Sequence, residues 1–227
     1  GVSAAPGGSP RVLAPASIAT MFGPHHQPDP RLPGVGLVFY RRIVDGHLLI
    51  EKSGLVPGFA AQLCLAPDDG VGVVACTNGA KDAHGWLGAE VADLVGAVLG
   101  LAGEGIRTDV PHRPEVWGDL CGWYALRGSW RDVQRWLLNG AQIAVRGGRL
   151  ILRPELPLPG LPGFTLHPDD PADPYVFRAD LSAVGMGSPR VVFTGGTAPT
   201  GPASAFHVEM EPILSFDRRP PVRTRRA

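Results

Sequence analysis

The spacing of apolar residues predicts an antiparallel meander in the first half of the chain. Short apolar runs predict strands in "VGLVFYRRI" and "GHLLIEKS", joined through "VDG", and in "FAAQLCLAP" and "VGVVACTN", joined through "DDG". Asp-Gly pairs favour a tight reversal of the chain. The four runs are therefore expected to pair with one another in chain order.

The spacing then becomes helical. Apolar residues recur every three or four positions at Trp86, Leu87, Val91, Leu94, Val95, Val98 and Leu99. This period predicts a helix from Trp86 to Leu101 that packs on the meander through this stripe. A shorter helix is predicted in "APASIATMF", where Pro15 and Ser17 favour a helix start.

The second half is β-rich. "AGEGIRTDVPHRPEV" has the composition of a linker, and short β-like runs follow it, two of them joined by "RGGR". The segment "SWRDVQRWLL" fits a helix or a strand. We predict an α+β fold, an antiparallel sheet with a packed helix followed by a small all-β barrel-like domain. The expected divisions are 1–105, a linker at 106–116, a β domain at 117–220 and a basic tail at 221–227.

Charge excludes some partners. The chain has 21 Lys and Arg residues and 21 Asp and Glu residues, so no net field favours nucleic acid or an anionic membrane. The longest apolar run, "VADLVGAVLG", is too short to cross a bilayer. The cellular compartment stays open.

The three cysteines do not predict a disulfide. Cys64 and Cys76 fall on neighbouring predicted strands, but an offset of three or four residues separates them by roughly 10 Å or more. That separation is too large for a disulfide. We expect Cys64, Cys76 and Cys121 to be buried thiols.

One short stretch carries candidate chemistry. In "EKSGLVPGF", Lys52, Ser53 and Gly54 stand on a predicted strand before a Pro-Gly turn. Lys52 is one of only two lysines in the chain. Motif frequency alone favours an exposed polar pair, whereas the surrounding "PGF", "PDDG" and "TNG" favour a hydrolase ancestry.

With those residues in place, the span from about Val12 to Leu101 resembles the last third of the serine β-lactamase and penicillin-recognising fold. It is most similar to the class C β-lactamase-like group, which includes penicillin-binding proteins and family VIII esterases. The resemblance implies that Lys52 is a cation near an acyl substrate, Ser53 a hydroxyl for its carboxylate or carbonyl, and Gly54 an open space. The amide of Leu55 would be one donor of the oxyanion hole.

The rest of that family's machinery is missing from the chain. No serine has a lysine three residues later, neither Tyr-x-Asn nor Ser-x-Asn occurs, and only 51 residues precede Lys52. We therefore expect a C-terminal piece of a serine hydrolase for β-lactams, peptides or esters, inactive alone and without a cofactor. Residues 117–220 resemble, less specifically, the lipocalin-like extension of some of these hydrolases.

Two other functional interpretations stay open. The chain is either a non-enzymatic module that binds a ligand or partner through its β domain, or a half whose missing N-terminal part comes from a separate chain. Because only one predicted helix covers the sheet, an apolar face is expected to favour self-association or a partner.

Structural interpretations are favoured at the remaining polar and aromatic clusters. His25, His26 and Asp29 are read as a loop rather than a metal site, and Asp169, Asp170 and Asp173 as a turn rather than a calcium site. No metal site is expected. The aromatic concentration is read as core filling, with Trp123 central, rather than as a ligand cavity. Its members are Trp117, Trp123, Tyr124, Trp130 and Trp136.

Overall fold

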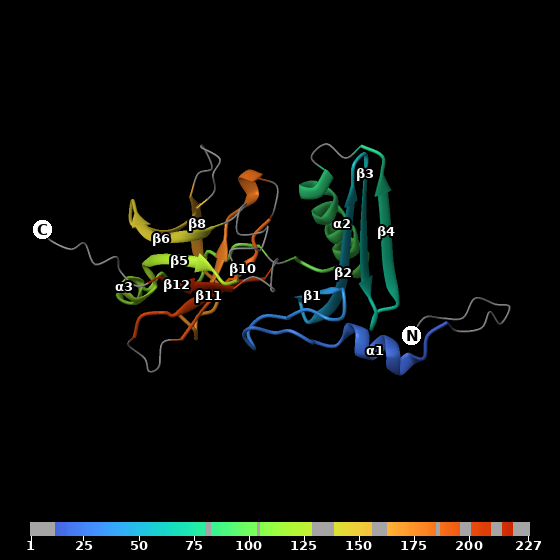
Figure 1. The fold of residues 1–227 in the computed structure, drawn as a ribbon, viewed down its shortest axis with the longest axis horizontal. Coiled ribbons are helices and arrows are strands. Elements are labelled where there is room, and N and C mark those ends of the chain that lie inside the picture. Colours follow the sequence, from blue (N-terminus) through green and yellow to red (C-terminus); the bar gives the residue numbers. More distant parts are fainter. Residues whose placement is uncertain are drawn as a thin grey trace, which may run out of the picture. The chain divides into compact units, whose positions relative to one another are not determined.

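The computed structural model describes residues 12–79, 83–103, 105–128, 139–155, 163–184, 187–195, 201–209 and 215–219. Within them the chain forms a four-stranded sheet with a packed helix and a closed eight-stranded barrel, so the predicted α+β fold is confirmed (Figure 1). The chain divides into two compact units. The first holds Gly1–Gly105 and Leu181–Ser188, and the second holds Ile106–Asp180 and Pro189–Ala227. The linker at 106–116 stays a prediction.

The first unit contains the predicted meander. Its elements are α1 (Pro15–Phe22), β1 (Tyr40–Val44), β2 (His47–Val56), β3 (Phe59–Ala66), β4 (Val71–Thr77) and α2 (Ala83–Leu99). The strands pair antiparallel in chain order. Asp45 and Gly46, with φ of 49° and 84°, make the tight turn between β1 and β2.

The first strand is shorter than predicted. "VGLVFYRRI" was expected to be extended from Val35, but β1 begins at Tyr40. Val38 has φ of 61°, in the left-handed region, which interrupts an extended strand. Val35 instead makes isolated bridges to His26 and Tyr40.

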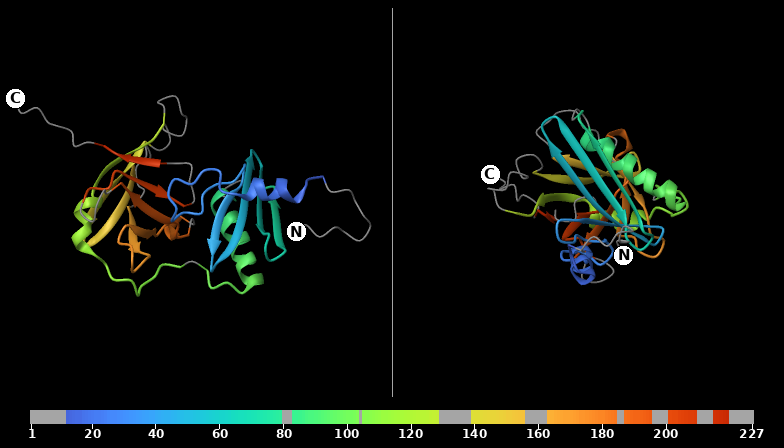
Figure 2. Two further views of the ribbon diagram at one scale, coloured as in Figure 1. Left: turned by 90° about the horizontal axis from the view of Figure 1, so that it is seen from below. Right: turned by 90° about the vertical axis from the view of Figure 1, so that its right-hand side faces the viewer.

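Helix α2 lies along one face of the sheet (Figure 2). It buries only part of its predicted stripe. Leu87, Val91 and Val95 pack against the sheet core, at a spacing of four residues. The prediction was wrong for three other members, since Trp86, Leu94 and Val98 are 44%, 52% and 60% exposed. A single sheet face contacts only a narrow stripe along α2, so the apolar side chains on either side of that stripe stay exposed in the described part of the chain.

The second unit is the barrel. Strand β12 pairs with β5 and thereby closes it. Gly147 and Gly148, both with positive φ, form the predicted "RGGR" turn. The segment "SWRDVQRWLL" and the tail at 221–227 lie outside the described residues. The elements are η1 (Pro114–Val116), α3 (Trp117–Leu120), β5 (Gly122–Leu126), β6 (Gly140–Arg146), β7 (Arg149–Glu155), β8 (Phe164–Pro168), β9 (Val176–Ala179), β10 (Arg190–Thr194), β11 (Ala205–Val208) and β12 (Ser215–Arg218), with η2 (Ser182–Val184) between β9 and β10.

Aromatic rings fill the barrel interior. Tyr124 contacts Phe193 and Phe206 at centroid distances of 6.1 and 5.1 Å, and Phe206 stacks on Phe216 at 4.5 Å. Of the predicted aromatic cluster, Tyr124 therefore fills the core, and Trp117 is also buried. Trp123 was expected in this core, but it is 45% exposed, because strand alternation directs Tyr124 inward and its neighbour outward. Trp130 and Trp136 lie outside the described residues.

The cysteines are free thiols, but they are not all buried. Cys64 pairs with Val73 and Cys76 with Ala61, so the expected offset along β3 and β4 is confirmed. Burial, with a smaller contribution from Glu51, raises the pKa of Cys64 to about 12. Cys76 is exposed and Cys121 half-buried, which corrects the expectation. Cys76 lies on the sheet face opposite α2, where the described part of the chain does not cover it.

Candidate functional site

The Lys-Ser-Gly motif lies on a strand segment that is paired along one edge only. The last β1–β2 pair joins Tyr40 to Glu51, whereas β3 continues along β2 as far as Val56. Among the described residues, the other edge of Lys52–Val56 is therefore unpaired, and β1 covers only the first part of β2 (Figure 1). We call this the open β2 edge.

Backbone alternation decides which groups point to the open β2 edge. A two-residue turn joins Val56 to Phe59, so this pair exchanges hydrogen bonds and every second residue back along β2 also faces β3. The β1–β2 turn gives the same result. Val44 and His47 close this turn as a hydrogen-bonded pair, so every second residue along β2 from His47, including Glu51, directs its backbone amide and carbonyl groups toward β1. Both counts direct the amide and carbonyl groups of Ser53 and Leu55 toward the open β2 edge.

The side chains of the motif lie on both faces of the sheet. Lys52 pairs across β3 with Leu63, on the face opposite α2, whereas Ser53 pairs with the buried Gln62 on the α2 face. Lys52 is exposed and Ser53 half-buried. Gly54 borders open space, because a Cβ added there would meet no atom within 4 Å. The Lys52 cation, the Ser53 hydroxyl and the unhindered backbone at Gly54 therefore all lie along the same strand edge.

The neighbouring acid does not neutralise Lys52. Glu51 is on the α2 face, where its Oε1 accepts a hydrogen bond from Arg42 Nη2 at 2.7 Å. The Cys64 thiol lies 3.7 Å from the same oxygen. Within the described part of the chain, the side-chain ammonium group of Lys52 has neither an ion pair nor a hydrogen-bond partner. Its charge is therefore available to a ligand or to another polypeptide.

The histidine loop has internal partners. His25 Nε2 lies 2.6 Å from the carbonyl oxygen of Thr20. Asp29 binds the guanidinium group of Arg31 through both carboxylate oxygens at 2.8 Å. The described residues hold no group of three or more side chains suited to a metal ion.

The acidic loop at 169–173 turns the chain and also anchors two arginines. Asp170 and Asp173 accept hydrogen bonds from backbone amides two residues later, as expected for a turn. Asp169 is buried and accepts from Arg178 Nε at 2.9 Å and Arg190 Nε at 2.8 Å. Sequence reasoning missed this ion cluster, because its members are far apart in the chain and share no motif.

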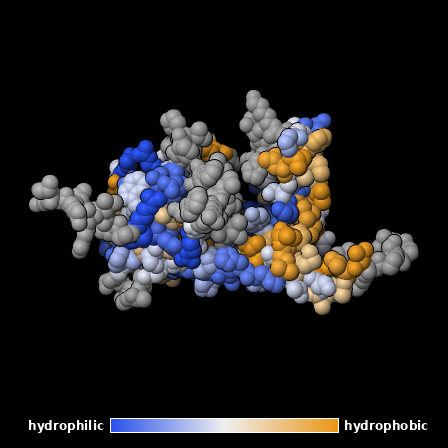
Figure 3. Space-filling model, viewed as in Figure 1, coloured by the Kyte–Doolittle hydropathy of each residue, from blue (hydrophilic) through white to orange (hydrophobic). Residues whose placement is uncertain are grey.

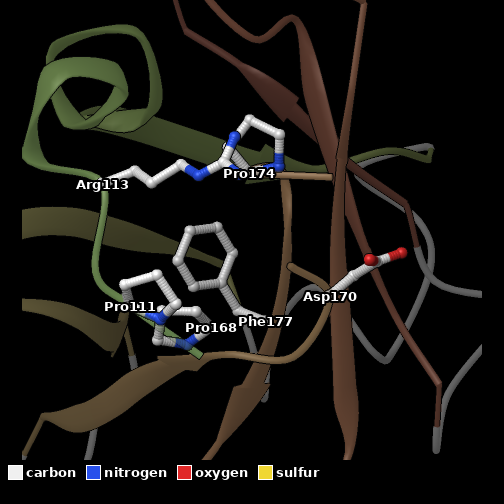
Figure 4. Close-up of a pocket in the computed structure, with 6 residues that line it drawn as sticks. All are labelled: Pro111, Arg113, Pro168, Asp170, Pro174 and Phe177. Carbon is white, nitrogen blue, oxygen red and sulfur yellow. The ribbon is translucent and has the colours of Figure 1, made fainter. Parts of the chain in front are cut away.

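A small hollow lies in the second unit. Figure 4 shows the Phe177 ring facing it, with Arg113 beside Pro174. Its interior space is about 10 Å³, room for about one water molecule. The lining residues are Pro111, Arg113, Pro168, Asp170, Pro174 and Phe177.

No protein-family model and no curated protein matches the chain. Among solved structures, it is similar to the crystal structure of SurE, with a TM-score of 0.51 and 18% identity over 90% of this chain and 42% of SurE. It is also similar to SurE with D-Leu, with a TM-score of 0.52 and 17% identity over 91% of this chain and 44% of that one. The chain therefore shares a fold with SurE over less than half of the SurE chain.

A third solved structure is the octameric penicillin-binding protein homologue from Pyrococcus abyssi. It matches 88% of this chain and 41% of its own, with 15% identity and a TM-score of 0.34, too low to establish a shared fold. These matches do not assign a role to any residue of this chain. The roles of Lys52, Ser53, Gly54 and Leu55 stay predictions.

No described helix is both long and apolar enough to cross a membrane.

Proposed function

We propose that this chain supplies the substrate-binding edge of a serine hydrolase of the class C β-lactamase-like group, acting on a β-lactam, peptide or ester. A polypeptide segment outside these 227 residues supplies the nucleophile. The observation that carries the proposal is the open β2 edge, where Lys52, Ser53 and the Leu55 amide meet along one unpaired strand segment. The fold shared with SurE supports it.

The open β2 edge offers the groups that an acyl substrate needs. An acyl group lying along the edge would receive a hydrogen bond from the Leu55 amide, which stabilises negative charge developing on the carbonyl oxygen. A substrate carboxylate would meet the Ser53 hydroxyl from one face and the Lys52 cation from the other. The open space at Gly54 lets the substrate approach the backbone.

Two hydroxyl groups of the described residues lie beside the same buried histidine, His207, and one of them, Thr194 Oγ1, is 3.4 Å from its Nε2. Ser215 Oγ lies 3.1 Å from His207 Nδ1, but these residues are only 7% and 4% exposed in the barrel wall, so an acyl substrate does not reach them. The binding-module alternative also gains no support from the barrel interior, which is filled by aromatic side chains.

The first test uses the 227-residue chain alone, with a chromogenic cephalosporin, p-nitrophenyl esters and a fluorescent penicillin. Because an acyl-enzyme requires an activated nucleophile, we expect no serine adduct by mass spectrometry. A stoichiometric adduct on a serine of this chain would overturn the proposal.

The second test restores the missing half by co-expression with the polypeptide encoded directly upstream. We expect acylation to appear, and to fall in Lys52→Ala and Ser53→Ala. Lys81→Ala, a change of the other lysine, is the matched control and should leave acylation unchanged. SurE was solved with D-Leu, so peptides and esters with a D-Leu carboxylate are suitable substrates to include. Equal acylation of all variants would exclude a role for Lys52 and Ser53.

A further inference from the structure

The outer wall of the barrel carries one exposed tryptophan, Trp123 on β5. Strand alternation directs Tyr124 into the barrel and Trp123 away from it, and Trp123 is 45% exposed. Within the described part of the chain, its ring contacts neither another aromatic ring nor a cation. Covering a large aromatic surface is favourable, so this indole can serve as a platform for a ligand.

Two polar side chains lie in one row with Trp123. Trp123 pairs with Gln142 on β6, and Gln142 pairs with Arg153 on β7. Directly opposite residues point to the same face of a sheet, so the three side chains share the outer wall. Neighbouring strands are about 4.8 Å apart, so the row spans about 10 Å. We call these three residues the Trp123 row.

The polar groups of the Trp123 row have no partners of their own. Among the described residues, neither the Gln142 amide nor the Arg153 guanidinium group has a hydrogen bond or an ion pair. Arg153 is exposed and Gln142 half-buried. The next outward residues along β5 and β6 are Ala125 and Ala144, whose small side chains do not cover the row. The wall therefore offers a ring, an amide and a cation side by side.

The acids on the same wall already have partners. Asp217 binds Arg127 at 2.7 Å, and Glu155 lies 3.6 Å from Arg219. Neither acid neutralises Arg153. Figure 3 shows strongly hydrophilic residues over the part of the barrel where β5 and β6 lie. The Arg153 guanidinium group is thus free to bind an anionic group of a ligand.

The spacing of the unpaired arginines indicates which kind of anion fits. Arg149, which also has no ion pair among the described residues, lies four residues before Arg153 on the same face of β7, about 13 Å away. A DNA strand carries one charge about every 3.4 Å, and sites for single-stranded nucleic acid stack successive bases on several rings. Trp123 is the only exposed Trp, Tyr or Phe of the described barrel residues. Widely spaced cations and a single ring fit a polymer with sparse charges.

We propose that the Trp123 row binds an acidic glycan, a chain of sugar rings of which some carry a carboxylate. The indole stacks on the apolar C–H face of one sugar ring. The Gln142 amide exchanges hydrogen bonds with hydroxyl or acetamido groups, and Arg153 binds the carboxylate of a neighbouring ring. This site lies in the second unit and is independent of the hydrolase proposal.

Defined oligosaccharides test the proposal. The 227-residue chain is titrated by NMR with a hyaluronan hexasaccharide, in which every second sugar carries a carboxylate, and with chitohexaose, which has none. We expect saturable binding of both, roughly fivefold tighter for hyaluronan, because an exposed ion pair contributes modestly. This preference should disappear at high salt, where exposed charges are screened.

Two tryptophan variants localise the contact. Trp123→Ala should weaken the binding of both sugars roughly tenfold, because the stacking surface is lost. Trp86→Ala is the matched control, since Trp86 is 44% exposed on α2 in the first unit, and it should leave binding unchanged. The thermal midpoint of the barrel, measured on the same samples, checks that each variant is folded. Equal binding by the two folded variants would overturn the proposal.

Two arginine variants isolate the carboxylate contact. Arg153→Gln should remove both the preference for hyaluronan over chitohexaose and its salt dependence, while the binding of chitohexaose stays unchanged. Arg153→Lys should keep part of the preference, because it retains the charge without the planar fork. An unchanged preference in Arg153→Gln would show that Arg153 does not bind the carboxylate.

The remaining outcomes decide between ligand classes. No saturable binding of hyaluronan or of an oligogalacturonate at millimolar concentration would overturn the proposal. Tighter binding of a thymidine oligonucleotide than of either acidic sugar, lost in Trp123→Ala, would assign the row to nucleic acid instead. Lys52→Ala should keep sugar binding whatever its effect on acylation, so a failure of the hydrolase proposal and a failure of this one are distinguishable.

Discussion

Tyr124 is the side chain around which the barrel interior is organised. It is fully buried, its hydroxyl donates to the Leu120 carbonyl at 2.8 Å, and its ring contacts Phe193 and Phe206. Tyr124→Ala should lower the free energy of unfolding of the barrel by about 3–5 kcal/mol, because it leaves a large cavity.

Trp123→Ala is the matched comparison, since Trp123 is 45% exposed on the same strand. It should cost less than about 1 kcal/mol. Tyr124→Phe isolates the hydroxyl and should cost about 1–3 kcal/mol by leaving the Leu120 carbonyl unpaired. Urea unfolding of the three variants measures these values, and an equal loss in Trp123→Ala and Tyr124→Ala would show that the inward face of β5 is wrongly assigned.

The buried Asp169 cluster predicts a second residue effect. The side chains of Asp169 and Arg178 are 6% and 5% exposed. Asp169→Asn removes the charge that compensates a buried guanidinium, so the free energy of unfolding should fall by about 3–5 kcal/mol. Asp217→Asn breaks an exposed pair with Arg127 and should cost at most about 1 kcal/mol. Chemical denaturation compares the two, and similar losses would mean that burial does not govern this cluster.

At the residue scale, a contiguous motif can be found in the sequence, but the burial of a single side chain cannot. Lys52, Ser53 and Gly54 are consecutive, so their motif is visible in one dimension. Trp123 and Tyr124 are both aromatic and adjacent, and a shift of one position exchanges the two faces of a strand. The sequence pattern could not decide which ring points inward, and only the pairing of β5 with its neighbours does so.

At the element scale, Gly54 tests whether the open β2 edge is a binding surface or a stretch of ordinary strand. A Cβ at Gly54 meets no atom within 4 Å, so Gly54→Ala should leave the unfolding midpoint nearly unchanged. Acylation of the complex with the upstream polypeptide should nevertheless fall, because a side chain would occupy the space left for substrate. Midpoint and acylation rate are measured on the same preparation.

Gly140→Ala is the opposite control. Its Cβ would overlap the backbone carbonyl oxygen of Tyr124, which cannot be accommodated without moving strand β5 or β6. We expect a lower barrel midpoint and no specific effect on acylation by the folded fraction. If Gly54→Ala instead behaves like Gly140→Ala, or leaves acylation intact, the open β2 edge does not contact substrate.

The order and type of the elements in the first unit followed from the sequence, but their covered faces did not. Helical period and Asp-Gly turns predicted α2 and the meander. The exposure of Leu94 and Cys76 depends on how much chain covers each face, which periodicity does not encode. Leu94 and Cys76 were both expected to be buried, and the described part of the chain leaves both exposed.

At the scale of the whole molecule, the segment 106–116 decides whether the barrel is an independent folding unit. Val110 is 6% exposed, and Arg107 and Arg113 donate to the carbonyl oxygens of Asp169 and Pro171 at 3.3 and 2.5 Å. These contacts lie within the second unit. A segment with a buried valine and two anchored arginines contributes to the barrel in addition to connecting it.

Two fragments test this contribution. Fragment 106–220 should unfold cooperatively, with a thermal midpoint close to that of the barrel transition in the full chain. Fragment 117–220 loses the burial of Val110, worth about 1.5–3 kcal/mol, together with both arginine anchors, so its midpoint should be lower. Lys52→Ala in the full chain should leave the barrel transition unchanged, because Lys52 belongs to the first unit. Equal midpoints for the two fragments would reduce 106–116 to a linker, and a fragment 106–220 without a cooperative transition would show that the barrel needs the first unit to fold.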